Sequence, residues 1–277
     1  MKSNIQATLL LASFIWALVA IQGCETTHVV HIHNGKPVED ESSQGNVQAA
    51  STSTDELLPV DITMIIDRSG SMGSLTEQVI ASYNEFIEDQ QEVEGDASIS
   101  LIQFDDKYEP NYTGMDIQKA TELTTKSYVP RGSTALFDAI GRAITEAKDR
   151  ITPGESDVVF VITTDGLENA STDYSGDVIK DLIADCESEY GWHFMYLASS
   201  DEAFNQHKDI GFQRSSCNQI EGTPEGWRDA QQGVSNQLML YRTDINRSSE
   251  LLEFEDEDEA VEEDDDAKDD ADMDDGC

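Results

Sequence analysis

Apolar runs of strand length alternate with helical patterns along the middle of this chain. Four runs are apolar over most of their length, at 58–67, 97–106, 157–166 and 192–201. Four further stretches carry apolar residues at helical spacing, at 75–90, 131–151, 177–190 and 224–241. Because such strands must be covered on both faces, the alternation predicts an α/β fold with a doubly wound, mostly parallel sheet.

The segment 108–115 departs from this pattern. It contains Pro110 and Gly114 and has no continuous apolar character. Proline cannot donate the hydrogen bond that a central strand needs, so we expect this segment to be a weak strand at the edge of the sheet.

The first 23 residues are expected to be a signal peptide. Lys2 precedes an apolar run from Leu9 to Ile21, which is shorter than a confident membrane span and ends on "IQGC". The small residue before Cys24 resembles a bacterial lipobox, although Gln22 departs from it. We therefore expect an exported lipoprotein, anchored to the cell envelope through Cys24, on the periplasmic side or at the cell surface. A plain secretory cleavage nearby is the alternative.

Charge and composition divide the rest of the chain. Residues 24–57 are polar and predict a tether, 58–244 form the expected domain, and 245–277 predict an acidic disordered tail. The formal net charge is −40, with acidic surplus in both the domain and the tail. This charge argues against nucleic acid or an anionic membrane face as a partner, because like charges repel.

The inner cysteines are the pair Cys186 and Cys217. Export places them in an oxidising compartment, so we expect a disulfide between them. The sequence contains no Cys-x-x-Cys, which leaves a zinc site or a thioredoxin-like site without support.

Oxygen-bearing side chains follow the predicted strands. Asp67, Ser69 and Ser71 follow the first strand in "DRSGSMGS", Asp165 follows the third in "TTDG", and Thr134 begins a helix in "RGST". Ligands in doubly wound sheets bind at the carboxyl ends of strands, so these side chains are expected to converge. Two carboxylates and three hydroxyls suit a hard divalent cation such as Mg²⁺ better than zinc. With only two charged ligands, such a cation would retain affinity for a further anionic ligand.

The region 58–244 resembles a von Willebrand factor type A domain. Asp67-x-Ser69-x-Ser71, Thr134 and Asp165 match the metal-ion-dependent adhesion site of that family. The resemblance implies a doubly wound sheet with one short antiparallel edge strand, and a bound Mg²⁺ or Mn²⁺. It also implies that the serine hydroxyls coordinate directly, Thr134 directly or through water, and the aspartates largely through water. Members bind protein ligands, often through an Asp or Glu carboxylate that completes the metal shell.

The expected function is therefore metal-dependent protein binding, in adhesion or complex assembly, and not an enzyme activity. Two alternatives stay open. A purely structural envelope protein is one. The other is a serine hydrolase of the α/β type, because "SGSMG" differs from the Gly-x-Ser-x-Gly elbow only at its first residue, and Asp165 and His193 or His207 follow Ser71. The bulk of Ser69 and the lack of a glycine-rich oxyanion loop disfavour the hydrolase.

Overall fold

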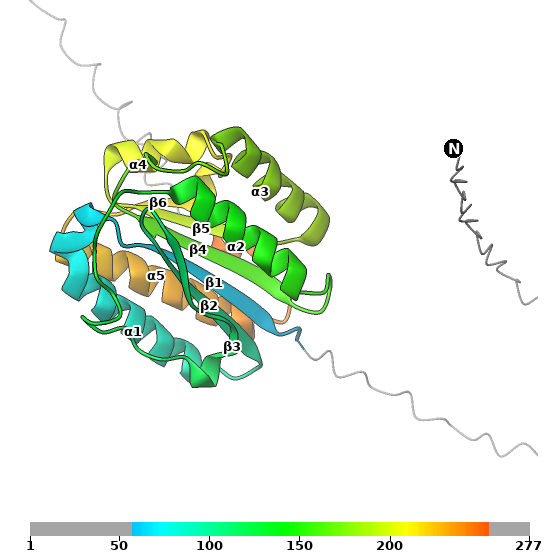
Figure 1. Cartoon of the computed structure of the whole chain (residues 1–277). Helices are drawn as coiled ribbons and strands as arrows, with labels where there is room; N and C mark the ends of the chain where they lie inside the picture. The colour runs from blue at the N-terminus through cyan, green and yellow to red at the C-terminus, as the bar shows by residue number, and fades with distance from the viewer. Residues whose placement is uncertain (1–56, 255–277) are drawn as a thin grey trace, which may run out of the picture. The chain divides into compact units, whose positions relative to one another are not determined.

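The computed structural model describes residues 57–254. The predicted signal peptide, Cys24, almost all of the tether and the tail beyond Phe254 lie outside the described residues. The described chain forms a six-stranded sheet in the order β3-β2-β1-β4-β5-β6 (Figure 1). Its strands are β1 (Val60–Asp67), β2 (Ala97–Phe104), β3 (Tyr108–Asp116), β4 (Asp157–Thr164), β5 (His193–Ala198) and β6 (Cys217–Gln219).

The sheet confirms the predicted fold class. Every neighbouring pair of strands is parallel except β2 and β3, which are antiparallel. The antiparallel strand β3 lies at the edge, where Pro110 and Gly114 are tolerated.

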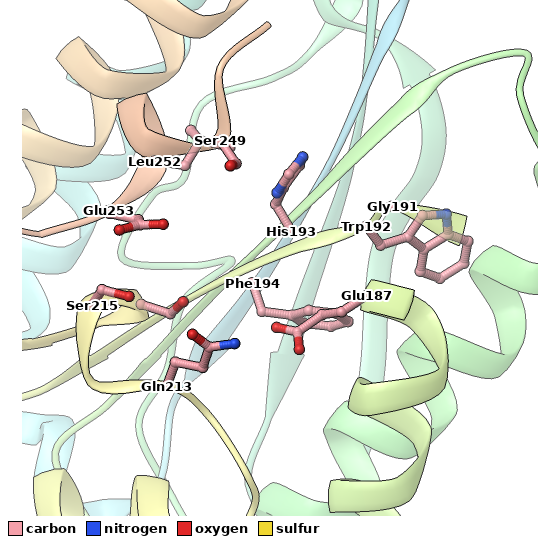
Figure 2. A pocket seen from close by; sticks show the side chains of 11 residues that line it. Glu187, Gly191, Trp192, His193, Phe194, Gln213, Ser215, Ser249, Leu252 and Glu253 are labelled. Carbon is pink, nitrogen blue, oxygen red and sulfur yellow. The ribbon is translucent and has the colours of Figure 1, made fainter. Parts of the chain in front are cut away.

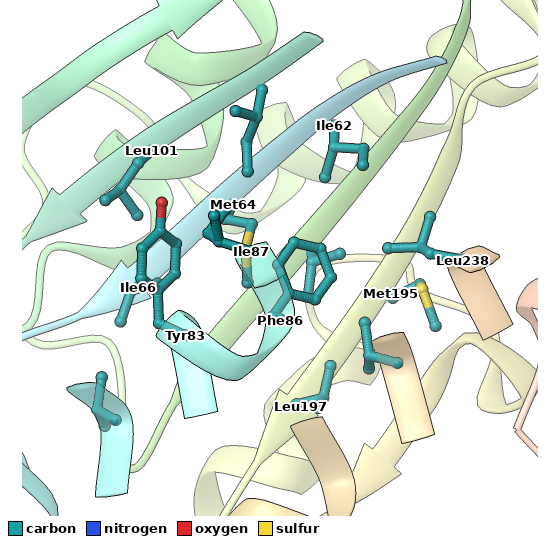
Figure 3. Close-up of a cluster of buried hydrophobic side chains, with 14 of the residues drawn as sticks. Ile62, Met64, Ile66, Tyr83, Phe86, Ile87, Leu101, Met195, Leu197 and Leu238 are labelled. Carbon is teal, nitrogen blue, oxygen red and sulfur yellow. The ribbon is translucent and has the colours of Figure 1, made fainter. Parts of the chain in front are cut away.

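Helices cover both faces of the sheet (Figure 1). One layer contains α1 (Thr76–Glu92) and α5 (Pro224–Thr243), and the other contains α2 (Leu136–Arg150), α3 (Gly176–Tyr190) and α4 (Asp201–Asn205). The alternation of side chains along β1 explains the two layers. Ile62 and Met64 pack with α1 and α5 (Figure 3), whereas Ile65 packs in the cluster on the other face. Burial of each such side chain contributes about 1.5–3 kcal/mol.

The helical patterns did not predict every element. The five-residue α4 and the three-residue β6 were not expected, because elements this short carry too little periodicity. The expected boundary at 244 is also too early: a 3-10 helix, η5 (Ser249–Leu252), follows α5 and buries Leu252. The N–H of Phe254 then donates to the carbonyl of Ser215 at 2.7 Å, so packed chain continues to the last described residue.

The expected disulfide is absent, because Cys186 and Cys217 are both free thiols buried in the core. Cys186 lies on α3, among the apolar side chains between that helix and the sheet. Cys217 begins β6 and donates from its Sγ to the carbonyl of Gln213. Each thiol is therefore a packing group within its own element.

Within residues 57–254, no helix combines the length and the apolar character needed to cross a membrane.

Candidate metal centre

Three loops at the carboxyl edge of the sheet bring the predicted ligands together. Asp67 is the last residue of β1, and the chain then turns into a 3-10 helix, η1 (Gly70–Leu75). Asp165 directly follows β4, which is the parallel neighbour of β1. Parallel neighbours end at the same edge, so the two aspartates lie side by side as the sequence predicts.

The Asp67 carboxylate is held in place from several sides. Its Oδ1 atom accepts from the N–H of Ser69 at 2.6 Å, and its Oδ2 atom accepts from the Thr164 hydroxyl at 2.6 Å. The Tyr128 hydroxyl donates to the main-chain carbonyl of Asp67 at 2.7 Å. Neither Thr164 nor Tyr128 was singled out from the sequence. Thr164 could have been found, because it ends a strand next to Asp165.

The serine hydroxyls join the two aspartates. Ser69 Oγ lies 3.1 Å from Ser71 Oγ, and the Ser71 hydroxyl donates to Asp165 Oδ1 at 2.6 Å. Asp67 and Ser69 are buried, whereas Ser71 is exposed, so the site opens to solvent on one side.

Thr134 lies on the same side of the sheet. Its hydroxyl is 3.3 Å, and that of Ser71 is 3.6 Å, from the position that a Cβ at Gly166 would occupy. The two hydroxyls thus flank one spot in the structure. Among the described residues, the Thr134 hydroxyl makes no hydrogen bond, although the residue is only 3% exposed. The hydroxyl is not among the fully buried polar atoms that lack a partner, so it reaches solvent and can accept a ligand.

This donor set fits a small hard cation. Mg²⁺ binds oxygen at about 2.1 Å in an octahedron, which places adjacent ligand oxygens about 3 Å apart. The Ser69–Ser71 hydroxyl separation of 3.1 Å matches that spacing. Within the described residues, no group of three or more His, Cys, Asp or Glu side chains gathers to hold a metal, so the hydroxyls are needed to complete this site.

Burial disfavours the ionised form of both carboxylates. It raises the pKa of Asp67 to about 6, against the lowering effect of hydrogen bonds from Thr164 and Ser69, and the nearby Asp165 charge adds to the rise. Burial also raises the pKa of Asp165, opposed by the Ser71 hydrogen bond. Both shifts have the sign expected where a cation would stabilise ionised carboxylates.

Comparison with known proteins gives the family. The sequence profile of the von Willebrand factor type A domain matches residues 61–220. The chain belongs to this family. No curated protein sequence matches it.

Solved structures show the same fold at low sequence identity. The vWF domain of the type V pili tip protein Mfa5 from Porphyromonas gingivalis is 14% identical with a TM-score of 0.52, over 68% of this chain and 97% of that one. The pilus adhesin SpaC from Lactobacillus rhamnosus GG is 13% identical with a TM-score of 0.53, over 66% of this chain and 30% of that one. Proximal thread matrix protein 1 from the mussel byssus is 14% identical with a TM-score of 0.50, over 67% and 47%.

In this type A domain, neither His193 nor His207 lies where the hydrolase alternative requires a general base. His193 begins β5 and pairs with Val159, so at about 3.3 Å per residue it lies about 20 Å from Asp165 along the strand direction. It lines a pocket of about 220 Å³. Glu187, Trp192 and Glu253 line the same pocket (Figure 2). That pocket is at the opposite end of the sheet from the metal centre.

His207 is not placed to act as the general base for Ser71 either. It is 3% exposed, packs against the Phe204 ring and bonds through Nδ1 to the carbonyl of Phe204. Ser71 donates directly to Asp165, with no imidazole between them. A Ser-His-Asp relay through Ser71 is therefore not assembled in this domain.

Proposed function

We propose that this type A domain is a metal-dependent protein-binding module, exported and anchored in the cell envelope, that acts in adhesion or complex assembly. Asp67, Ser69, Ser71, Thr134 and Asp165 would hold Mg²⁺ or Mn²⁺. The proposal is supported chiefly by the convergence of these five oxygen donors from three loops, with the Ser69 and Ser71 hydroxyls 3.1 Å apart. The pilus adhesin and the pilus tip protein named above share the fold and support a binding role.

The bound ion would supply a Lewis-acidic position for an Asp or Glu carboxylate of the partner. The residues around it prepare that contact. Asp67 and Ser69 are buried, so solvent reaches the centre from the side of exposed Ser71. A partner that covers this side would exclude water, and a charged pair in a partly dry interface is stronger than an exposed one.

The partner surface follows from the same charges. With a net charge of −40, the chain repels nucleic acid and anionic membrane faces over long range. A protein that brings a carboxylate to the metal and basic residues to the surrounding surface is the complementary partner. Attachment to the membrane would come from lipid on Cys24 rather than from the domain.

Binding measurements with and without metal test this function. Calorimetry with Mn²⁺ should detect a specific site in the full chain that Asp67→Ala and Asp165→Ala both lack. Ser71→Ala and Thr134→Ala should weaken it without unfolding the sheet. A pull-down from envelope extracts in Mg²⁺ should yield a partner that EDTA and Asp67→Ala both release. A partner whose affinity ignores EDTA and Asp67→Ala would refute the proposal, as would labelling of Ser71 by a serine-directed probe.

A further inference from the structure

Helix α2 starts later than the sequence indicates. We expected it to begin at the Ser-Thr pair of "RGST", but its first residue is Leu136, and the N-cap residue Ala135 offers no side-chain hydrogen bond. The first N–H groups of a helix have no partner within the helix. Here other segments supply the acceptors, and the Thr134 side chain is not used as a cap.

Glu168 provides one of these acceptors from the loop that carries Asp165. Its Oε2 atom accepts from the N–H of Phe137 at 3.0 Å, in the first turn of α2. The neighbouring Ser171 hydroxyl accepts from the N–H of Asp138 at 3.0 Å. A carboxylate at this place also interacts favourably with the helix dipole.

The same carboxylate organises its own loop. Oε1 accepts from the N–H groups of Ala170 at 2.8 Å and Ser171 at 2.7 Å, and Oε2 also accepts from the Ser171 hydroxyl at 2.7 Å. Counting Phe137, four hydrogen bonds converge on Glu168. Both oxygens thereby join the loop to the first turn of α2, so Glu168 acts as a brace between the loop and the helix.

The residues next to Glu168 hold the main chain of Thr134. Asn169 Oδ1 accepts from the N–H of Thr134 at 3.0 Å. In return, the carbonyl of Thr134 accepts from the N–H groups of Asn169 at 3.0 Å and Ala170 at 3.1 Å. Asn169 and Ala170 adjoin Glu168 in sequence, so a shift of its carboxylate moves the contacts that orient Thr134.

We propose that Glu168 is a positioning residue of the metal centre, which sets the spacing between Asp165 and Thr134 by capping α2 from the Asp165 loop. This inference rests on the proposed metal site. Asp165 precedes the brace by three residues, and Thr134 precedes the capped turn, so one carboxylate fixes both ligands. Residues that orient ligands from outside the metal shell typically contribute 10–100-fold to affinity.

Asp138 offers a matched control. Its carboxylate accepts from the N–H groups of Thr172, Asp173 and Tyr174, at 2.8 to 2.9 Å, and so holds the far end of the same loop. The Glu168 carboxylate binds Ala170, whose N–H also donates to the carbonyl of Thr134, whereas none of the three partners of the Asp138 carboxylate bonds to Thr134 in the described structure. Asp138→Asn therefore weakens a carboxylate brace of similar size without acting on the ligands.

The test measures Mn²⁺ affinity and the melting temperature of the full chain, with Asp67→Ala as the background for binding elsewhere on this acidic protein. Glu168→Ala and the milder Glu168→Gln should lower specific Mn²⁺ affinity at least about tenfold and reduce the rise in melting temperature that Mn²⁺ causes. Asp138→Asn should lower the metal-free melting temperature and leave Mn²⁺ affinity within about twofold, because its contacts lie outside the ligand spacing.

The outcomes separate this inference from the proposed function. If the unmodified chain shows no Mn²⁺ binding above the Asp67→Ala background, the metal function itself fails and the inference falls with it. If the unmodified chain binds and the Glu168 variants bind equally well, only the positioning role is overturned. The same holds if Asp138→Asn weakens Mn²⁺ binding as much as Glu168→Gln, because Glu168 would then be one structural brace among several.

Discussion

Arg68 Nε lies 2.9 Å from Asp105 Oδ2, and both side chains are almost fully buried beside the metal centre. Arg68 stands between Asp67 and Ser69, and Asp105 directly follows β2. Arg131, on the loop that leads to Thr134, reaches the same Oδ2 atom at 2.9 Å. The carbonyl of Asp105 also accepts from the N–H of Ala135. One buried carboxylate thus ties two of the ligand-bearing loops to the end of β2.

Asp105→Asn should therefore destabilise the domain strongly. Without the Asp105 charge, the buried Arg68 keeps only the half-exposed Glu109 as an anionic partner, and breaking a buried ion pair costs up to about 3–5 kcal/mol. Urea unfolding of the metal-free chain measures the loss. Glu109→Gln is the control, because Glu109 pairs with the same two arginines but its side chain is 46% exposed. Its loss should stay below about 1 kcal/mol. Equal losses for the two variants would contradict the role assigned to Asp105.

The convergence of the candidate ligands could be predicted from the sequence, because each of them follows a strand end or precedes a strong helix. Strands β1 and β4 are apolar over nearly their whole length. Their ends and their parallel pairing can therefore be predicted from the local pattern of apolar residues. Asp67 and Asp165 then meet because parallel neighbours end at one edge.

The supporting contacts could not be predicted, because they join residues far apart in the chain. Glu168 caps a helix that begins 32 residues earlier in the chain. No capping motif in the sequence next to the helix indicates this contact. The Ser-Thr pair even suggested a different helix start, since Thr134 satisfies the local preference for an N-cap. The disulfide was wrong for a related reason. Cysteine count and compartment give no information on whether two thiols face each other.

Gly166→Ala should weaken metal binding and leave the fold intact. A Cβ there would stand 3.3 Å from Thr134 Oγ1, so this hydroxyl must shift by a few tenths of an ångström, whereas Ser71 Oγ at 3.6 Å is in ordinary van der Waals contact. Mg²⁺ demands near-ideal geometry, and we expect a loss of about threefold to tenfold in affinity. Gly73→Ala is the matched control, because a Cβ at Gly73 meets nothing within 4 Å. Calorimetry that gives the two variants the same Mg²⁺ affinity would show that Gly166 does not border the site.

Cys24→Ala should release the protein from the membrane. The "IQGC" sequence places Cys24 where a lipoprotein carries its acyl chains, and two or three chains anchor firmly where one does not. Detergent-phase partitioning of the exported protein should therefore be nearly complete for the unmodified chain and nearly lost for the variant. Unchanged partitioning of Cys24→Ala would mean that the anchor lies elsewhere or that the signal peptide is retained.

Acidity should stabilise the metal-free domain through Asp67. Its pKa is about 6 in the folded chain, against 3.8 without burial, so the folded state binds more protons between these values. The contribution of Asp67 to the free energy of unfolding therefore falls as pH rises from about 4 to 6. The fall is roughly 3 kcal/mol, at 1.36 kcal/mol per pKa unit. A bound divalent cation removes the penalty, because it stabilises the ionised carboxylate.

Asp67→Asn isolates this effect, since all other titrating groups are shared with the unmodified chain. The Thr164 hydroxyl, which donates to Asp67, can turn to the carbonyl of Gly166 at 3.1 Å when the acceptor is lost. In EDTA at pH 7, urea unfolding should show Asp67→Asn to be more stable than the unmodified chain, and the difference should shrink by pH 4.5. In saturating Mg²⁺ at pH 7, the order should reverse, because only the unmodified chain gains binding energy. If Asp67→Asn is the less stable protein in EDTA at pH 7, the buried Asp67 carboxylate is not under the electrostatic penalty that favours a cation at this site.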